Sequence, residues 1–168
     1  MSGGSLLIDH YRHPRCRGEV EDPTCRHEVY NRKCGDRITL TARVESDRLK
    51  EIRFEGEGCM YCLASASILC STLSGLPPGE ARRLVLRFRE WIRGEGGAAA
   101  QRTSDVQPGA EEAGSAEAGR SADPDLTEGM QALGEVKAFP MRIDCADLAW
   151  KCAEVILESG RDRRDANG

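Results

Sequence analysis

Apolar and polar residues alternate in two consecutive runs in the first third of the chain. The apolar positions are Ile38, Leu40, Ala42 and Val44 in the first run and Ile52 and Phe54 in the second. A period of two is typical of a strand with one buried face. Residues 45–48 between the runs have the character of a hairpin turn, and residues 27–32 before them are compatible with a third strand. The pattern therefore predicts a small antiparallel sheet of three strands.

Other segments show the spacing of an amphipathic helix. They are residues 6–11, 59–73, 81–92 and 145–156. Pro14 brings the first segment to an end, and Asp144 is a good N-cap for the last, which we expect to end at Gly160. A three-stranded sheet with one apolar face needs a helical cover. We therefore predict an α+β fold in which helices cover the sheet.

The segment from residue 94 to residue 125 interrupts this pattern. It is rich in Gly, Ala, Ser and acidic residues, has almost no large apolar side chain and shows no periodicity. Such a composition cannot bury enough apolar surface to fold. We therefore predict one domain made of residues 1–93 and 126–160, a disordered insert over 94–125 and a disordered polar tail over 161–168.

Composition and charge exclude several classes of partner. The formal net charge of -4 offers no general attraction for nucleic acid. No apolar run approaches membrane-spanning length, and residues 1–5 lack the basic and long apolar parts of a signal peptide. We therefore expect a cytoplasmic protein without nucleic-acid or membrane partners. Thiols stay reduced in that compartment, so the eight cysteines are expected to be ligands, nucleophiles or core residues rather than disulfides.

Cys59 lies where a predicted strand gives way to a predicted helix. Gly58 before it is an acceptable N-cap, which places Cys59 in the first helical turn. The unpaired backbone N–H groups and the positive end of the helix dipole favour a thiolate there, the form that binds metals and attacks sulfur. Cys145 repeats this situation behind Asp144. Both cysteines are therefore candidates for chemistry.

A turn supplies a further candidate pair, because Cys34-Gly35-Asp36 separates two predicted strands. Gly35 lets the backbone turn so that a thiolate and a carboxylate can face one point, an arrangement that suits a metal ion. Taken alone the tripeptide is a weak signal, since turns are rich in Gly and Asp.

The remaining cysteines have simpler explanations, with one exception. Those expected to pack in the core or to be incidental are Cys16, Cys25, Cys70 and Cys152. Cys62 forms a C-x-x-C pair with Cys59, as in thioredoxin-like redox proteins. That fold needs parallel strands joined by crossovers, whereas a short hairpin turn joins the strands here. A module in which the metal only stabilises the fold is another alternative.

Several motifs of the chain occur together in one known family. The matching stretches are Asp9-His10-Tyr11-Arg12-His13-Pro14-Arg15, Cys34-Gly35-Asp36-Arg37-Ile38, Phe54-Glu55-Gly56-Glu57-Gly58-Cys59, Ala64-Ser65-Ala66-Ser67 and Phe139-Pro140-Met141-Arg142-Ile143-Asp144-Cys145-Ala146-Asp147-Leu148-Ala149-Trp150. They keep a consistent order over residues 6–93 and 126–159, which is more specific than any single cysteine pair. In these stretches the chain resembles the U-type iron–sulfur cluster assembly family.

The resemblance implies a metal site at one end of the sheet, formed by Cys34, Asp36, Cys59 and Cys145. Members of the family take persulfide sulfur from a cysteine desulfurase. The scaffold branch assembles a [2Fe-2S] cluster at this site, whereas the SufU-like branch holds zinc and acts mainly as a sulfur acceptor. Thiolates suit zinc, iron and iron–sulfur clusters, so the ligand types leave the identity of the metal open.

Two features favour the SufU-like branch and therefore zinc. This branch carries an insertion between its second and third ligand cysteines, as the chain does before Cys145. The scaffold branch has a histidine immediately before the last cysteine, where Asp144 stands here. SufU-like proteins usually have lysine at that place, so we expect the negative charge of Asp144 to raise the pKa of Cys145 unless a metal offsets it.

The resulting hypothesis is a metal-binding sulfur acceptor in iron–sulfur cluster biogenesis, with Cys34 as the acceptor and Cys145 as the alternative. The first alternative function is a scaffold that assembles a [2Fe-2S] cluster and transfers it to apo-proteins. The second, from another class, is a C-x-x-C thiol–disulfide redox protein. The sequence leaves two possibilities for the activity, a sulfurtransferase-like accessory protein and a non-enzymatic scaffold.

Overall fold

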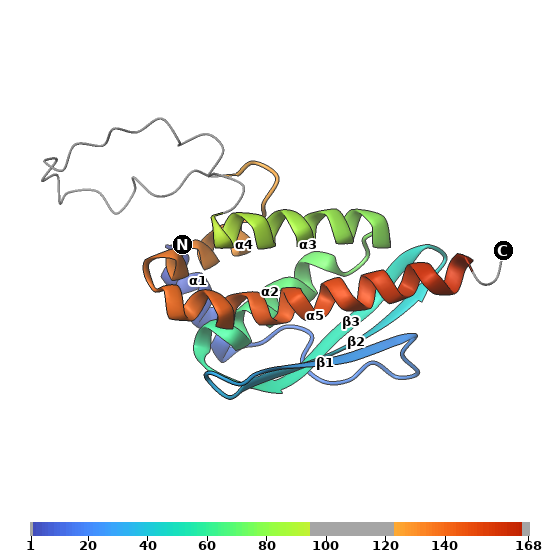
Figure 1. The fold of residues 1–168 in the computed structure, drawn as a ribbon, viewed down its shortest axis with the longest axis horizontal. Coiled ribbons are helices and arrows are strands. Elements are labelled where there is room, and N and C mark those ends of the chain that lie inside the picture. The colour runs from blue at the N-terminus through green and yellow to red at the C-terminus, as the bar shows by residue number, and fades with distance from the viewer. Residues whose placement is uncertain (1, 95–122, 166–168) are drawn as a thin grey trace, which may run out of the picture.

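The computed structural model describes residues 2–94 and 123–165, and its fold is α+β (Figure 1). The elements in chain order are α1 (Gly3–Arg12), β1 (Cys25–Asn31), β2 (Asp36–Glu45), β3 (Arg48–Glu57), α2 (Met60–Leu73), α3 (Pro78–Arg93), α4 (Glu128–Ala132), the 3-10 helix η1 (Leu133–Ala138) and α5 (Pro140–Asp165). The strands form an antiparallel sheet in the order β1-β2-β3, and helices pack against it. The predicted sheet and its helical cover are therefore confirmed.

The register of the sheet places Asp36 at one end of it. Asn31 pairs with Asp36, and Arg37 pairs with Glu57, so the turn between β1 and β2 lies beside the end of β3. Gly56 is required here because a Cβ atom at this position would lie 2.1 Å from the carbonyl oxygen of Arg37. The chain then leads directly from this end of the sheet into α2.

Helix α2 is the central helix of the molecule. It packs against α1, α5 and β3, and every side chain from Ala64 to Cys70 is buried. The N-cap of α2 is Cys59 rather than the predicted Gly58, and the helix begins at Met60. Cys59 still lies at the helix N-terminus, where the first backbone N–H groups have no partner within the helix.

Helix α5 begins earlier and ends later than predicted. Pro140 is its first residue, because the fixed φ of proline suits the first helical position and its missing N–H would be unpaired there anyway. Asp144 is therefore not the N-cap, and Cys145 lies in the second turn. The helix continues through the predicted end at Gly160 to Asp165, so residues 161–165 of the predicted tail are helical.

Aromatic packing and buried hydrogen bonds hold the part of α5 that follows Cys145. The rings of Trp150 and Phe88 stack with centroids 4.1 Å apart. The indole Nε1 of Trp150 donates a hydrogen bond of 2.8 Å to the hydroxyl of Ser65, which donates one of 2.6 Å to the carbonyl of Ala146. Because these groups are buried and paired, they resist rearrangement and hold α5 in place on α2.

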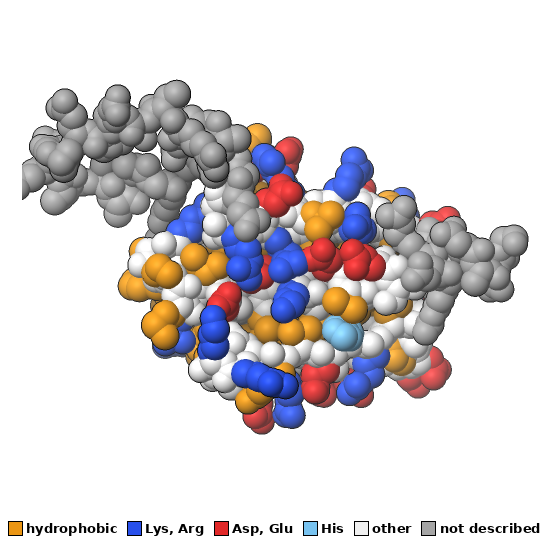
Figure 2. Space-filling model, in the orientation of Figure 1, with side chains coloured by type: hydrophobic (Ala, Val, Ile, Leu, Met, Phe, Trp, Pro, Cys, Tyr) orange, Lys and Arg blue, Asp and Glu red, His pale blue; other side chains and the backbone are white. Residues whose placement is uncertain are grey.

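Ion pairs join α3 to α5. The guanidinium groups of Arg89 and Arg93 lie 2.8 Å and 2.6 Å from the carboxylate of Asp147, which is 1% exposed. Arg89 also pairs with Glu154. Figure 2 shows Lys and Arg side chains interspersed with acidic ones across this face.

Most of the predicted insert lies outside the described residues, which stop at Gly94 and resume at Asp123. Gly94 ends α3 with a left-handed φ of 77°. The carboxylate of Asp123 forms an ion pair of 2.7 Å with Arg87. This contact links the chain at Asp123 to α3. The proposed limits of the domain and of its insert stay predictions. In the described part of the chain, no helix has the length and apolar character to cross a membrane.

Candidate metal centre

Elements far apart in the sequence bring the four predicted site residues to the same end of the sheet. Cys34 lies in the turn between β1 and β2, Asp36 begins β2, Cys59 caps α2 and Cys145 lies in α5. The Sγ atoms of Cys145 and Cys34 are 3.7 Å apart, and the Sγ of Cys59 is 3.8 Å from Oδ2 of Asp36. The ligand atoms of Cys34, Asp36 and Cys145 all lie within 4.8 Å of one another.

The members of this cluster differ in their access to solvent. Cys34 is exposed and Cys59 is half-buried, whereas Cys145 and Asp36 are only 1% and 4% exposed. Gly35 supports the exposed position of Cys34 with a left-handed φ of 75°. Cys34 is thus the most exposed thiol of the cluster, and Cys145 is buried in α5.

Buried Asp36 is surrounded by thiols rather than by cations. Within residues 2–94 and 123–165, no lysine, arginine or histidine forms an ion pair with its carboxylate. Burial, together with hydrogen bonds to Asp36 and Cys34 and the nearby Cys59, raises the pKa of the Cys145 thiol. A carboxylate and several thiols that share a buried pocket favour a bound cation, which neutralises the carboxylate and deprotonates the thiols.

Arg142 is a basic residue at the rim of the cluster that sequence reasoning did not single out for the site. A side-chain hydrogen bond to Cys145, with the nearby charge of Cys59, raises the pKa of its guanidinium. Its place in the helix, three residues before Cys145, puts it on the same helical face. The three-residue spacing between Arg142 and Cys145 could have identified Arg142 in the sequence. It was missed because the helix was predicted to begin at Asp144 rather than at Pro140.

The structure does not show the predicted effect of the Asp144 charge on the pKa of Cys145. The Asp144 carboxylate lies 3.7 Å from Nζ of Lys33 and 3.4 Å from the guanidinium of Arg93. The pKa of Cys145 is raised by burial and by its neighbours Asp36, Cys59 and Cys34. Asp144 is thus not among the causes of the raised pKa of Cys145, and two cations lie beside its carboxylate.

The donor atoms fit a zinc ion or an iron–sulfur cluster. Two thiolates of a tetrahedral zinc site with bonds of about 2.3 Å lie about 3.8 Å apart. The sulfur atoms of Cys145 and Cys34 are separated by 3.7 Å. Thiolates also hold iron in clusters, and a carboxylate completes either donor set. The geometry fits both groups and does not distinguish between them.

The other candidate residues lie apart from this cluster or beside it. Cys70 and Cys152 are fully buried in the core, where Cys152 donates a hydrogen bond of 3.2 Å to the carbonyl of His27. Nδ1 of His10 lies 2.8 Å from the hydroxyl of Ser67 and is used in packing α1 on α2. All eight cysteines are free thiols.

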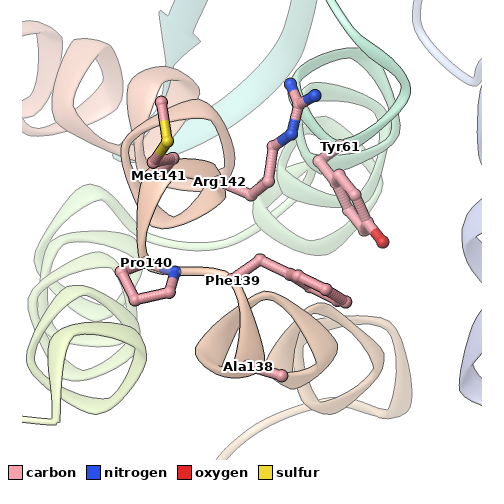
Figure 3. Close-up of a pocket in the computed structure, with 6 residues that line it drawn as sticks. All are labelled: Tyr61, Ala138, Phe139, Pro140, Met141 and Arg142. Carbon is pink, nitrogen blue, oxygen red and sulfur yellow. The ribbon is translucent and has the colours of Figure 1, made fainter.

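A shallow pocket of about 450 Å³ adjoins the cluster through Arg142 (Figure 3). Its lining residues are Tyr61, Ala138, Phe139, Pro140, Met141 and Arg142. In Figure 3 the rings of Tyr61 and Phe139 lie on the same side of the pocket. Phe139 is 54% exposed and Met141 is 88% exposed, so large apolar side chains stand at the surface beside the thiols. Exposed apolar groups of this kind mark surfaces that bind partners.

Comparisons with known proteins identify the class to which this fold and site belong. Residues 5–113 match the model of the NifU-like N-terminal domain. The chain therefore belongs to the NifU-like N-terminal domain family, as the resemblance of its motifs predicted.

The relatives carry two kinds of name within iron–sulfur cluster assembly. The chain is 32% identical to the zinc-dependent sulfurtransferase SufU of Bacillus subtilis over 149 residues, which cover 89% of this chain and 84% of the relative. It is 27% identical to the iron–sulfur cluster assembly scaffold protein IscU of Thermotoga maritima over 158 residues, 94% of each chain. The crystal structure of a SUF-system scaffold protein from Fervidobacterium islandicum superimposes with a TM-score of 0.70 at 22% identity, covering 90% of this chain and 93% of that one. At that identity the superposition shows a common fold.

Proposed function

We propose that the protein is a metal-binding sulfur acceptor in iron–sulfur cluster biogenesis, which takes persulfide sulfur from a cysteine desulfurase. The observation that carries the proposal is the buried Asp36, which shares its pocket with the thiols of Cys34, Cys59 and Cys145. The similarity to a zinc-dependent sulfurtransferase over most of both chains supports zinc as the favoured metal.

The proposed ligands are Cys34, Asp36, Cys59 and Cys145. Bound zinc would keep the three thiols deprotonated at neutral pH and hold them in a fixed arrangement. The chain contributes different elements to this arrangement. Cys145 and Asp36 are buried, whereas Cys34 lies on an exposed turn.

Sulfur transfer follows from the exposure of Cys34. The thiolate of Cys34 attacks the outer sulfur of the persulfide on the desulfurase cysteine. The sulfur–sulfur bond of the donor breaks, its cysteine leaves as a thiolate, and Cys34 carries the transferred sulfur as a new persulfide. The exchange is redox-neutral. Cys145 is the alternative acceptor, but its 1% exposure requires α5 to move before a partner can reach it.

The partner protein is expected to cover the apolar surface beside the cluster. Phe139 and Met141 are exposed there, and Arg142 lines the same pocket and interacts with Cys145. This placement suits a desulfurase that delivers a loop carrying its persulfide. The free thiols of the chain agree with a reducing, cytoplasmic location.

A scaffold that assembles a [2Fe-2S] cluster and passes it to apo-proteins is the second candidate. It is supported by the similarity to the scaffold protein IscU of Thermotoga maritima along nearly the full length of both chains. The C-x-x-C redox alternative has less support. The strands of the sheet are antiparallel and joined by short turns, whereas a thioredoxin-like fold needs parallel strands linked by crossovers.

Anaerobic purification followed by metal analysis and a desulfurase assay distinguishes the first two functions. We expect about one zinc ion per chain and faster turnover of a partner desulfurase on addition of the protein. Cys34→Ala should abolish this stimulation, and Cys70→Ala, which removes a core thiol, should retain it. A coloured protein that passes its cluster to an apo-protein without stimulating the desulfurase would overturn the acceptor proposal.

A further inference from the structure

The two edges of the sheet differ in how they are covered. Strand β3 is one edge, where Arg17 forms a bridge with Phe54 and the backbone of Leu49 forms hydrogen bonds with residues 75 and 76. Strand β1 is the other edge and pairs with β2 on one side only (Figure 1). In the described part of the chain, no segment besides β2 forms a backbone-to-backbone hydrogen bond or a bridge with residues 26–30. The outer side of β1 therefore presents backbone N–H and C=O groups with which another strand can pair.

Strand β1 also lacks several features that protect an edge from pairing. Proteins commonly place a proline, a lysine or a β-bulge on an exposed edge strand. Residues 25–31 contain neither proline nor lysine. The register with β2 runs without a break from Cys25 to Asn31, so the strand has no bulge. A second strand can therefore pair along its whole length.

The side chains of β1 that face the helices are incompletely covered. Val29 pairs with Ile38, and Cys25 pairs with Ala42, so these residues point to the same side of the sheet as the core. Ile38 and Ala42 are 0% exposed, whereas Cys25 and Val29 are only half-buried. Apolar surface thus stays open at this edge, and a further strand beside β1 covers it.

The sequence of β1 is complementary to itself in one antiparallel register. When two copies pair around a two-fold axis at His27, Arg26 lies opposite Glu28 of the second copy. Cys25 then lies opposite Val29 of the second copy, on the helix-facing side. Opposite charges and apolar pairs stabilise neighbouring antiparallel strands, and the symmetry forms each contact twice. An axis at residue 26 or 28 instead places like charges opposite each other.

Both charged side chains are accessible for this pairing, because Arg26 and Glu28 are exposed. The hydroxyl of Thr39 donates a hydrogen bond of 3.0 Å to the carboxylate of Glu28 and orients it on the open face of the sheet. The guanidinium of Arg26 lies 3.7 Å from the carboxylate of Glu19, and both side chains are more than half exposed. Such a pair contributes little stability, so Arg26 can exchange it for a new partner.

We propose that β1 is a homodimerisation edge, at which two copies of the chain pair antiparallel around His27 and form one six-stranded sheet. The interface is separate from the proposed metal site. Asn31, at the end of β1 that leads to Cys34, is four residues from the axis. At about 3.3 Å per residue, the two Asn31 residues lie about 26 Å apart, at opposite ends of the paired strands. Both thiol clusters therefore stay open to other proteins in the dimer.

Sedimentation equilibrium of four full-length proteins tests the proposal, with a reductant present so that exposed thiols form no disulfide-linked dimers. The proteins are the wild type, Arg26→Glu, Glu28→Arg and Arg26→Glu/Glu28→Arg. We expect a reversible dimer of the wild type. Each single charge reversal places two like-charged pairs in the interface and should raise the dissociation constant at least about tenfold. The double variant restores opposite charges and should dimerise within about threefold of the wild type.

A mixture of the two single variants gives a further test. It should form heterodimers, because each acidic residue at the edge of one variant then faces an arginine of the other. Glu55→Arg reverses an exposed charge on β3 of the same sheet, controls for net charge and should dimerise as the wild type does. A wild type that stays monomeric at about 0.5 mM, single variants that dimerise as the wild type does, or a mixture without dimers would overturn the proposal. None of these outcomes bears on the proposed sulfur transfer.

Discussion

Two buried carboxylates of this molecule have different neighbours. Asp147 lies between Arg89 and Arg93, which supply positive charge from α3. Asp36 is as deeply buried, but its neighbours are the thiols at the end of the sheet, and it forms no ion pair with another described residue. Because an uncompensated buried carboxylate is costly, Asp36 calls for a cation that the chain does not provide. The comparison separates a carboxylate that joins helices from one that we propose to hold a metal.

Replacing Asp36 should have the largest effect, and the effect should fall on the metal. Asp36→Ala is expected to lower zinc affinity at least about 100-fold, because a charged ligand is lost from a site that needs four. The free energy of unfolding of the metal-free protein should not fall, since no ion pair is broken and a buried carboxylate without a cation is removed. Competition with a chelator measures the affinity. An unchanged affinity would remove Asp36 from the site.

Replacing Asp147 should have the opposite effect, which is to lower the stability and leave the zinc affinity unchanged. Asp147→Ala leaves Arg89 and Arg93 without their shared partner, and we expect the free energy of unfolding to fall by about 2 kcal/mol. This is less than for a fully buried pair, because both arginines reach water. Zinc affinity of the folded variant should stay close to that of the wild type. Denaturant titration gives the stability, and a variant as stable as the wild type would show that the network contributes little.

Thiols also differ between the two regions, because Cys152 is buried in the core and is not a proposed metal ligand. Burial raises the pKa of Cys152 from 9.0 to about 12. The folded protein therefore keeps the proton at pH values where the unfolded chain loses it, and this stabilising effect is lost as the pH rises from 9.0 towards 12. We expect the contribution to stability to fall by up to about 1.4 kcal/mol per pH unit in that window. Cys152→Ala should flatten the pH dependence of unfolding of the metal-free protein, and an identical slope would contradict this account.

The smallest effect is expected at the exposed ion pair between α3 and α5. Arg82 and Glu158 lie 3.3 Å apart, and Glu158 is largely open to water. Glu158→Ala should change the free energy of unfolding by less than about 0.5 kcal/mol. This variant is the matched control for Asp147→Ala, since both remove a carboxylate of α5 that pairs with an arginine of α3. A loss as large as that of Asp147→Ala would mean that burial does not decide the strength of these pairs.

Local pattern predicted the sheet and the helices that cover it, whereas the family resemblance predicted which residues meet at its end. The alternation along β2 and β3 and the turn at residues 45–48 specify a hairpin, and this register brings Asp36 beside the start of α2. Cys34, Asp36, Cys59 and Cys145 could be grouped because the family resemblance joined segments that local pattern alone cannot place together.

The beginning of α5 and its long-range partners could not be predicted in this way. Asp144 has the side chain of an N-cap, yet it pairs with Lys33 and Arg93, and the helix starts at Pro140. Proline at a first helical position was the available signal, but the side chain of Asp144 favoured a later N-cap. The pairing of Asp147 with α3 depends on tertiary packing, because the arginine spacing in α3 is equally typical of a solvated face.

The metal content of two double variants tests the central claim most directly. Cys34→Ala/Cys59→Ala removes two proposed ligands, and Cys70→Ala/Cys152→Ala removes two thiols from the core. After anaerobic purification, we predict that the first protein lacks metal and that the second retains about one ion per chain. Stoichiometric metal in the first protein would contradict the account, since the cation would then be held elsewhere.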